Sequence, residues 1–412
     1  MSMGKPKIRF QGYTEDWEQR KLSDYLEVSK EKNKEEIFGK EDVLSVSGEF
    51  GIVNQIEFQG RSFAGASVAN YGVVEVGDVV YTKSPLKSNP YGIIKTNQGK
   101  SGIVSTLYAV YKARNNVNPE FVQIYFELDS RMNSYMHPLV NKGAKNDMKV
   151  SDENALKGPV IFPEIEEQKL ISQYFARLDR LITLHQRKCD ETKKLKKYML
   201  QKMFPQNGHS VPEIRFAGFT EDWEQRKLGN MGSTFTGLSG KNKEDFGHGD
   251  AQFITYMNVF SNPVANIEMT EAIEIDTKQN SVKKGDVFFT TSSETPEEVG
   301  MSCVMPENIE NIYLNSFCFG YRPIEKFDLD YLAYVLRADS FRKEMTFLAQ
   351  GISRYNISKN KVMEVSIPVP NLEEQAMVGE CFTTLDHLIT LHQQKCEKLQ
   401  KIKKFMLQNM FV

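Results

Sequence analysis

Two long segments of the chain carry apolar and amphipathic residues at alternating intervals of four and three positions, over 171–203 and 378–410. This heptad spacing predicts two helices of about 40 residues that pack against another helix. Pro205 ends the first helix, because proline removes a backbone hydrogen bond and clashes with the preceding turn. Asn371, followed three positions later by Glu374, predicts a capping box at the start of the second helix.

The segments outside these helices contain short apolar runs bounded by Gly, Asn and Pro clusters, which is typical of strands joined by loops. The clearest apolar runs are 73–82, 103–111, 287–291 and 317–321. Short helical patterns also occur, at 119–135 and 329–348. The pattern therefore predicts an α+β fold, in which mixed α/β domains accompany two long helices.

The chain contains an internal tandem repeat. Residues 6–22 (PKIRFQGYTEDWEQRKL) and 212–228 (PEIRFAGFTEDWEQRKL) are identical at 14 of 17 positions. Residues 178–189 (LDRLITLHQRKC) and 385–396 (LDHLITLHQQKC) are identical at 10 of 12 positions. Two matches at nearly the same offset indicate a duplication, whereas a solenoid would show shorter periods and more copies.

Between the matched blocks the two halves diverge. Residues 23–160 and 229–367 share only scattered anchors, notably the Gly-Asp-Val triplets at 77–79 and 285–287. Nearly equal length with different content indicates one scaffold that carries two different surfaces.

The repeat and the helices together predict five segments. They are a first mixed domain (1–162), a central helix (163–204), a linker (205–211), a second mixed domain (212–369) and a C-terminal helix (370–412). Two long helices in one chain most simply pair with each other, antiparallel, and separate the two domains. A coiled coil between two molecules is the alternative.

The repeated blocks resemble those of the specificity subunits of type I restriction-modification systems. The opening pattern P-x-I-R-F-x-G-[YF]-x3-W-x3-K-L occurs at 6–22 and again at 212–228. The helix entries are similar too, as I-F-P-E-I-E-E-Q at 161–168 and V-P-N-L-E-E-Q at 369–375. The stretch at 351–358 resembles the family's G-x4-N-[LI]-S element.

This resemblance implies a sequence-specific DNA-binding subunit without catalytic activity. Each mixed domain would be a target recognition domain that reads one half of a bipartite double-stranded DNA target, and the paired helices would fix the distance between the halves. Two methylase subunits would methylate adenine with S-adenosylmethionine, and restriction subunits would cleave DNA with ATP and magnesium. No cofactor is therefore expected in this chain. Half-sites one DNA turn apart lie about 34 Å from each other, a distance that helices of this length can span.

Composition and charge add two constraints. No run of about 18 apolar residues occurs, so no membrane span is expected, and five widely spaced cysteines predict a reducing cytoplasmic location. The formal net charge of −2 is unusual for a protein that binds DNA alone. Either the basic residues are segregated onto one face, or partner subunits share the contacts with DNA.

Motifs for catalysis or metal binding are weak in the sequence. Residues 89–91 (NPY) are the nearest approach to the adenine-methyltransferase loop, but the second proline is missing and a proline turn is the simpler interpretation. No glycine-rich cofactor loop or H-E-x-x-H is found. Two His-x3-Cys pairs, at 185–189 and 392–396, would suit zinc if the helices aligned them. As seam positions they are predicted to be core residues, and no metal site is expected.

Two sets of polar residues are candidates for DNA contact, because Arg, Lys, Asn and hydroxyl side chains bond base edges and phosphates. The set that follows the Gly-Asp-Val strands consists of Lys83, Ser84 and Lys87 in the first half and Thr291, Ser292 and Ser293 in the second. The set near the end of each domain consists of Lys142, Lys145, Asn146 and Lys149 in the first half and Arg354, Tyr355 and Asn356 in the second. The first copy departs from the family element, since 143–151 is one residue longer and has Lys149 in place of Asn356. An ordinary solvated loop residue is the alternative for each candidate.

Two other functions account for parts of the sequence. A coiled-coil scaffold that does not bind DNA explains the helices but not the two divergent domains on matching frames. A self-sufficient methyltransferase or nuclease would need the cofactor or metal motifs that were not found. Trp17 and Trp223, which are identical in both repeats, are predicted to be core residues of the scaffold rather than platforms for base stacking.

Overall fold

The computed structural model describes residues 4–83, 89–142, 148–206 and 208–412. The chain forms two compact units, one of residues 1–185 with 394–412 and the other of residues 186–393. We call them unit 1 and unit 2. Two long helices of 38 residues each, α4 (Ile165–Lys202) and α10 (Leu372–Asn409), contribute to both units.

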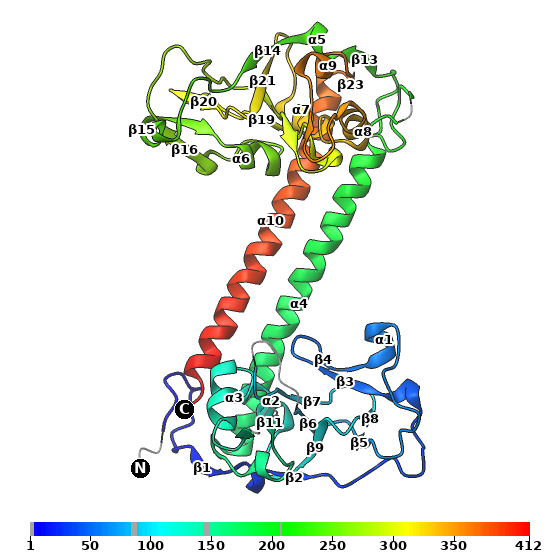
Figure 1. Ribbon diagram of the computed structural model, residues 1–412, viewed down its shortest axis with the longest axis vertical. Coiled ribbons are helices and arrows are strands. Elements are labelled where there is room, and N and C mark those ends of the chain that lie inside the picture. Colours follow the sequence, from blue (N-terminus) through cyan, green and yellow to red (C-terminus); the bar gives the residue numbers. More distant parts are fainter. Residues whose placement is uncertain (1–3, 84–88, 143–147, 207) are drawn as a thin grey trace. The chain divides into compact units, whose positions relative to one another are not determined.

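Unit 1 is built around a four-stranded antiparallel sheet with the order β2-β9-β6-β7 (Figure 1). Its strands are β1 (Glu18–Lys21), β2 (Leu26–Val28), β3 (Leu44–Ser47), β4 (Gly51–Asn54), β5 (Gly72–Val74), β6 (Val79–Thr82), β7 (Ile94–Thr96), β8 (Gly102–Val104), β9 (Tyr108–Ala113), β10 (Asn141–Lys142), β11 (Met148–Lys149) and β12 (Pro159–Phe162). Its short helices are α1 (Gln55–Gln59), α2 (Pro119–Tyr125) and α3 (Asp129–Met136). The central strand β6 is buried along its whole length, which explains its uninterrupted apolar run.

Unit 2 contains a four-stranded antiparallel sheet with the order β14-β21-β17-β19, which matches the sheet of unit 1 strand for strand. Its strands are β13 (Glu224–Lys227), β14 (Gly232–Thr236), β15 (Phe246–Ile254), β16 (Thr270–Ile273), β17 (Val287–Thr290), β18 (Ser292–Ser293), β19 (Ser302–Val304), β20 (Ile312–Leu314), β21 (Cys318–Pro323), β22 (Tyr355–Asn356) and β23 (Ser366–Val369). Its short helices are α5 (Leu228–Met231), α6 (Tyr256–Ser261), α7 (Leu329–Val335), α8 (Asp339–Leu348) and α9 (Lys359–Met363). The units differ beside this sheet: unit 2 adds the three-stranded sheet β16-β15-β20, whereas unit 1 has the separate pairs β3-β4 and β5-β8.

The Gly-Asp-Val anchors form the same turn in both units. Gly77 and Gly285 have positive φ angles of 90° and 84°, in the left-handed region that glycine adopts without strain. The following aspartate accepts a hydrogen bond from a backbone N–H three residues earlier, at 2.8 Å in each unit. These turns lead into β6 and β17, so the anchors that survived divergence are those that start the central strands.

The predicted helical patterns at 119–135 and 329–348 are each two short helices. In both units the first helix has a side-chain N-cap, supplied by Asn118 for α2 and by Asp328 for α7. A short break follows, after which α3 or α8 begins. The apolar periodicity continues across the break, so the sequence pattern alone did not reveal it.

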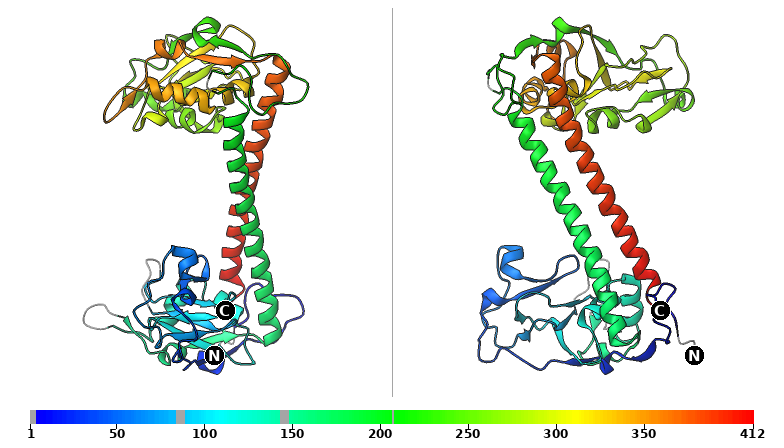
Figure 2. Two further views of the ribbon diagram at one scale, coloured as in Figure 1. Left: turned by 90° about the vertical axis from the view of Figure 1, so that its right-hand side faces the viewer. Right: turned by 180° about the vertical axis from the view of Figure 1, so that it is seen from behind.

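The heptad seams are the buried and half-buried faces of α4 and α10, as predicted. In unit 1, the Nζ of Lys403 lies 2.6 Å from Asp179, and the rings of Phe175 and Phe411 pack at 6.1 Å. In unit 2, Lys196 bonds Asp386 at 2.5 Å. In each unit the two helices therefore lie side by side with opposite directions (Figure 1 and Figure 2). The predicted antiparallel pairing within one chain is confirmed, and so is the α+β fold class.

Lys403 supports a first prediction. It bonds both Glu127 and Asp179 at 2.6 Å while its own side chain is 16% exposed. Replacing Lys403 by methionine leaves two carboxylates without their cation, and we expect it to destabilise the chain by about 1–3 kcal/mol. Partial exposure of both carboxylates keeps the loss below that of a fully buried pair. Urea denaturation measures the change. Lys404→Ala, at an exposed neighbouring position, is the control and should cost less than about 0.5 kcal/mol.

The repeated opening block is bound to the entry of the long helix of the same repeat. In unit 1, Arg9 forms a two-pronged ion pair with Glu167, with both contacts at 2.8 Å. In unit 2, Arg215 pairs with Glu374 at 2.7 and 2.9 Å. Trp223 also donates its indole N–H to Glu374, at 3.0 Å. The arginine of the opening block and the glutamate of the helix entry are the same in both repeats, and the ion pair that they form in each unit explains why.

The capping box predicted at the start of α10 is half correct. The side chain of Asn371 accepts a hydrogen bond from the backbone N–H of Glu374 at 2.9 Å, as an N-cap does. The Glu374 carboxylate, however, bonds Arg215 and Trp223 instead of returning to the cap. Arg215 and Trp223, which come from the opening block, thus replace the N-cap backbone as the partners of the Glu374 carboxylate.

The glutamine that follows fixes the mixed domain to the helix. In unit 1, the side chain of Gln168 accepts from the backbone N–H of Asn118, the residue that caps α2. In unit 2, Gln375 accepts in the same way from Asp328, the cap of α7. Gln168 and Gln375 are both buried. The helix entry therefore positions the short helices that cover each four-stranded sheet.

The end of each long helix supplies core residues to the unit in which it ends. Phe411 packs among aromatic rings of unit 1, and Phe204 packs on Trp223 and Phe382 of unit 2. Trp17 and Trp223 are 1% and 2% exposed, which confirms that both are core residues. Each compact unit thus combines a mixed domain from one repeat with the tail of a helix from the other.

Candidate nucleic-acid interface

The two predicted sets of the second half come together in a short two-stranded ribbon of unit 2. Ser292 pairs with Asn356 and Ser293 with Tyr355, which makes β18 and β22 antiparallel neighbours. The backbone of Thr291 extends the contact by accepting from the N–H of Ile357 at 3.0 Å. Residues more than 60 positions apart in the sequence therefore form one local surface. They were predicted as loop residues, whereas most of them are in strands.

The exposed side chains of this ribbon come mainly from β22 and the turn before it. Ser292 and Ser293 are 4% and 8% exposed, so little of either side chain is accessible outside the ribbon, and their contact with DNA stays a prediction. Ser293 donates to Glu298 at 3.2 Å, and the hydroxyl of Thr291 donates to a backbone carbonyl at 2.8 Å. Arg354 and Asn356 are exposed, and Tyr355 is half-buried. The serines build the ribbon, and the exposed set presents a basic and an amide side chain.

A cleft of about 400 Å³ lies beside the ribbon. Its lining residues are Tyr256, Met257, Phe260, Ser292, Ser293, Glu294, Glu298, Ser353 and Arg354. Tyr256 and Phe260 stack with their ring centroids 6.0 Å apart. The Tyr256 hydroxyl donates to the carbonyl of Ser292 at 2.7 Å, and burial raises the pKa of this phenol. The cleft thus combines an aromatic wall with one arginine and two glutamates.

Two half-buried arginines hold the backbone segments that flank this cleft. Arg337 donates to the carbonyls of Val259, Phe260 and Asn262 at 2.8–3.1 Å. Arg342 donates to three carbonyls at 2.7–2.8 Å, those of residues 297, 299 and 300. Burial lowers the pKa of each guanidinium to about 10. Each arginine uses several of its five N–H donors on backbone, so both are structural residues rather than DNA contacts.

Arg342 supports a second prediction. Replacing Arg342 by methionine removes the donors of three carbonyls, and we expect a loss of about 1–3 kcal/mol of unfolding free energy. Faster hydrogen exchange over 296–302 should accompany it. Lys343→Ala, at an exposed position on the same helix, is the matched control and should change neither quantity measurably. Unaltered exchange in the arginine variant would show that the segment is held by other contacts.

Of the first-half candidates, the structure describes Lys83 and the backbone of Lys142 and Lys149. Lys83 follows β6 and forms an ion pair with Asp152 at 3.0 Å, so its charge is already partly balanced. Lys142 and Lys149 lie at the ends of the paired strands β10 and β11. Four other candidates lie outside the described residues: Ser84, Lys87, Lys145 and Asn146. Contact between any candidate and DNA stays a prediction.

Sequence reasoning missed several residues that lie beside the candidate contacts in each unit. Leu107 and Phe317 occupy equivalent turns, since their carbonyls accept from the backbone N–H groups of Lys83 and Thr291 at 3.0 Å. Their side chains are 60% and 57% exposed. An apolar residue in a strand-rich segment is normally assigned to the core, so no sequence signal marked them. Tyr256 and Glu298 were missed because only strand pairing brings their segments to β22.

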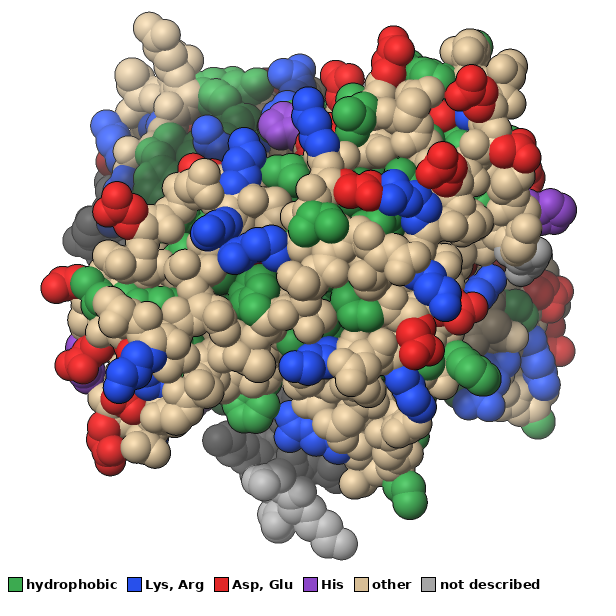
Figure 3. Space-filling model, turned by 90° about the horizontal axis from the view of Figure 1, so that it is seen from above, with side chains coloured by type: hydrophobic (Ala, Val, Ile, Leu, Met, Phe, Trp, Pro, Cys, Tyr) green, Lys and Arg blue, Asp and Glu red, His purple; other side chains and the backbone are tan. Residues whose placement is uncertain are grey.

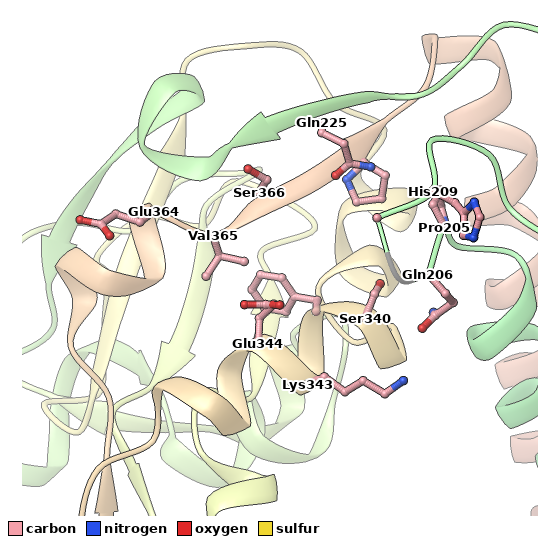
Figure 4. Close-up of a pocket in the computed structure, with 13 residues that line it drawn as sticks. Pro205, Gln206, His209, Gln225, Ser340, Lys343, Glu344, Glu364, Val365 and Ser366 are labelled. Atoms are coloured by element: carbon pink, nitrogen blue, oxygen red, sulfur yellow. The ribbon is translucent and has the colours of Figure 1, made fainter.

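Another cleft of unit 2 does not bring its charged side chains together in a comparable way. A second cleft, of about 420 Å³, lies where the chain leaves α4, between β13, β23 and α8. Figure 4 shows that its ionisable side chains, among them Lys343, Glu344 and Glu364, do not converge on one point. On the face drawn in Figure 3, basic and acidic side chains are interspersed. That face is therefore not a continuous basic surface for the DNA backbone.

The described part of the chain holds no group of three or more His, Cys, Asp or Glu side chains arranged to bind a metal ion. The two His-x3-Cys pairs accordingly form no such group. Among the described residues, no helix has the length and apolar character to cross a membrane.

Comparisons with known proteins agree with this architecture. Residues 220–401 match the family model described as the type I restriction modification DNA specificity domain. Two proteins of Methanocaldococcus jannaschii named as type I restriction enzyme specificity subunits are each 24% identical to the chain. The MjaX protein is matched over 95% of this chain and 91% of its own length, and the MjaVIII protein over 74% and 72%.

Two solved structures share the fold. The specificity subunit of a type I restriction-modification system from M. genitalium superposes with a TM-score of 0.57 at 11% identity, over 99% of both chains. A chain from a study of complex assembly and conformational transition in a type I system superposes with a TM-score of 0.52 at 16% identity, over 96% of this chain and 97% of that one. At such identities the likeness concerns the fold alone, and it agrees with the predicted fold class.

Proposed function

Because the chain belongs to the specificity-subunit family of type I restriction-modification systems, we propose that it reads a bipartite DNA target and has no catalytic activity of its own. Unit 1 reads one half of the target and unit 2 reads the other. Partner subunits carry out methylation of adenine and cleavage of DNA at the sites that this chain selects.

One observation carries the proposal: the two units share a frame and differ at the surface that it presents. The Arg–Glu ion pair, the glutamine at the domain cap and the matching four-stranded sheets occur in both units. The residues beside the central strands differ. Unit 1 has Lys83, which is ion-paired with Asp152, whereas unit 2 has the two-stranded ribbon of β18 and β22 next to Arg354. A repeated frame with different recognition surfaces is what two readers of different base sequences require.

The partners follow from the same proposal. Two methylase subunits bind S-adenosylmethionine, restriction subunits bind ATP and magnesium, and this chain binds no cofactor. A net charge of −2 fits such a division of labour, since several subunits then neutralise the phosphates of one DNA duplex. A coiled-coil scaffold that does not bind DNA is the alternative. This alternative does not explain why the exposed Arg354 lies beside a cleft with an aromatic wall.

The test is a binding selection with the chain in complex with its methylase subunits. Fragments of genomic DNA are incubated with the complex at about 0.15 M salt, since affinity for DNA depends on ionic strength. The bound fragments are then sequenced. We expect enrichment of fragments that share two short words at a fixed separation. A complex that forms without retaining DNA would favour the scaffold instead.

A further inference from the structure

We propose that Arg354 reads a guanine in the half-site of unit 2, donating from its two terminal nitrogens to O6 and N7 in the major groove. The inference rests on the proposed function and adds the identity of one base and of the residue that reads it. Arginine bonds to guanine in this two-pronged manner because guanine alone presents two adjacent acceptors there.

Arg354 differs from the other arginines of unit 2. The others pair with carboxylates or backbone carbonyls: Arg187 with Glu191, Arg215 with Glu374, Arg226 with Glu325, Arg322 with Asp286, and Arg337 and Arg342 with carbonyls. In the part of the chain that the structure describes, Arg354 has neither kind of partner. Its guanidinium bonds the hydroxyl of Ser292. Among the described residues, an exposed arginine whose guanidinium bonds only one hydroxyl keeps its terminal nitrogens available for a ligand.

The contact with Ser292 also selects which edge of the guanidinium is available. The Nε of Arg354 lies 3.3 Å from the Ser292 hydroxyl oxygen. Ser292 is buried and is fixed by pairing with Asn356 and by the Tyr256 hydroxyl on its carbonyl. With Nε bonded to Ser292, the two terminal nitrogens remain as donors for a ligand and form a planar fork. Such a fork matches a pair of acceptors better than a single one.

The surroundings of Arg354 favour a base over a phosphate. Glu294 and Glu298 line the same cleft, and both are exposed. Carboxylates in the same cleft repel a phosphate that approaches Arg354, because like charges disfavour each other. A base edge carries no net charge. The cytosine paired with the guanine offers an amino group, which a glutamate accepts.

The experiment compares Arg354→Ala, Arg354→Lys and the control Arg226→Ala in the complex with the methylase subunits. Arg226 is an arginine of the same unit whose charge Glu325 already balances. Binding is measured on duplexes of the selected target in which each base pair is changed in turn. We expect Arg354→Ala to lose roughly 5- to 150-fold discrimination at one G·C pair in one half of the target, with the other half and the gap unchanged.

The lysine variant separates base reading from general attraction to DNA. Lysine keeps the positive charge but lacks the planar fork, so we expect Arg354→Lys to relax the same G·C position. Arg226→Ala should keep the wild-type preference. A uniform loss of affinity for every duplex would overturn the proposal in favour of a phosphate contact. Wild-type discrimination in both Arg354 variants would also overturn it, as would a target without a G·C pair in either half. If the wild-type complex selects no split target at all, the proposed function itself fails, which is a separate result.

Discussion

Replacing Phe411 by alanine is expected to lower the free energy of unfolding by about 3–5 kcal/mol, although this residue follows the end of α10. Its ring is 5% exposed. It lies 5.7 Å from the ring of Phe121, 6.1 Å from Phe175 and 6.2 Å from Trp17. Removal of the ring takes away a large apolar area and leaves a cavity in the core of unit 1, which rigid aromatic neighbours cannot fill.

Urea denaturation followed by tryptophan fluorescence measures this loss, since Trp17 is in contact with the ring. Phe405→Ala is the matched control, because Phe405 lies in the last turns of α10 and is 54% exposed. The control should cost less than about 1 kcal/mol. Equal effects of the two substitutions would show that the end of α10 is not part of the core of unit 1.

Replacing Glu374 by alanine is expected to lower the free energy of unfolding by about 3–5 kcal/mol as well, because a largely covered guanidinium is left without its buried carboxylate. Glu374 has a side chain 1% exposed, and that of Arg215 is 12% exposed. The same carboxylate accepts from the indole N–H of Trp223 at 3.0 Å. The substitution therefore leaves one cation and one buried donor unsatisfied.

Glu373→Ala provides the control for this substitution, because the neighbouring carboxylate is exposed and in the same helical turn. We expect thermal unfolding of the Glu374 variant at a clearly lower temperature and little change for the control. A double variant that also replaces Arg215 by methionine should recover part of the loss, since no charge is then buried alone. Absence of any recovery would mean that the ion pair is not the source of the effect.

Features that depend on local spacing could be predicted from the sequence. The heptad seam identified α4 and α10, and the burial of Phe175 and Phe382 follows that seam. The repeat indicated that both halves share one scaffold, and the Gly77 and Gly285 turns occupy equivalent places in it. These predictions succeeded because periodicity and duplication can be recognised by comparing residue types along the chain and need no tertiary information.

Features that depend on long-range contacts could not be predicted. The sequence around Glu374 gives no sign that Arg215 and Trp223 bind its carboxylate. The local pattern therefore predicted a capping box instead. The burial of Ser292 follows from its pairing with Asn356, 64 positions away. Likewise, the ion pair between Lys83 and Asp152 joins segments that the sequence leaves unrelated.

The structural units also differ from the sequence repeats. Unit 1 takes its last 19 residues, 394–412, from the second repeat, and unit 2 begins within the helix of the first. Lys403 and Lys196 occupy equivalent positions of the repeat, and each bonds an aspartate of the opposite repeat. The repeats are thus interlocked, so separate expression of residues 1–205 would remove Phe411 and Lys403 from unit 1. A boundary drawn from the repeat alone would miss this exchange.

The most direct test of a two-reader subunit is a map of adenine methylation in cells that express this chain with its methylase subunit. Long-read sequencing reports every methylated position in the genome. We predict one split motif, made of two short defined halves around a gap of fixed length and unspecified sequence. A complex that assembles and binds DNA but produces an uninterrupted motif, or no motif at all, would contradict the proposal that the two units read DNA separately.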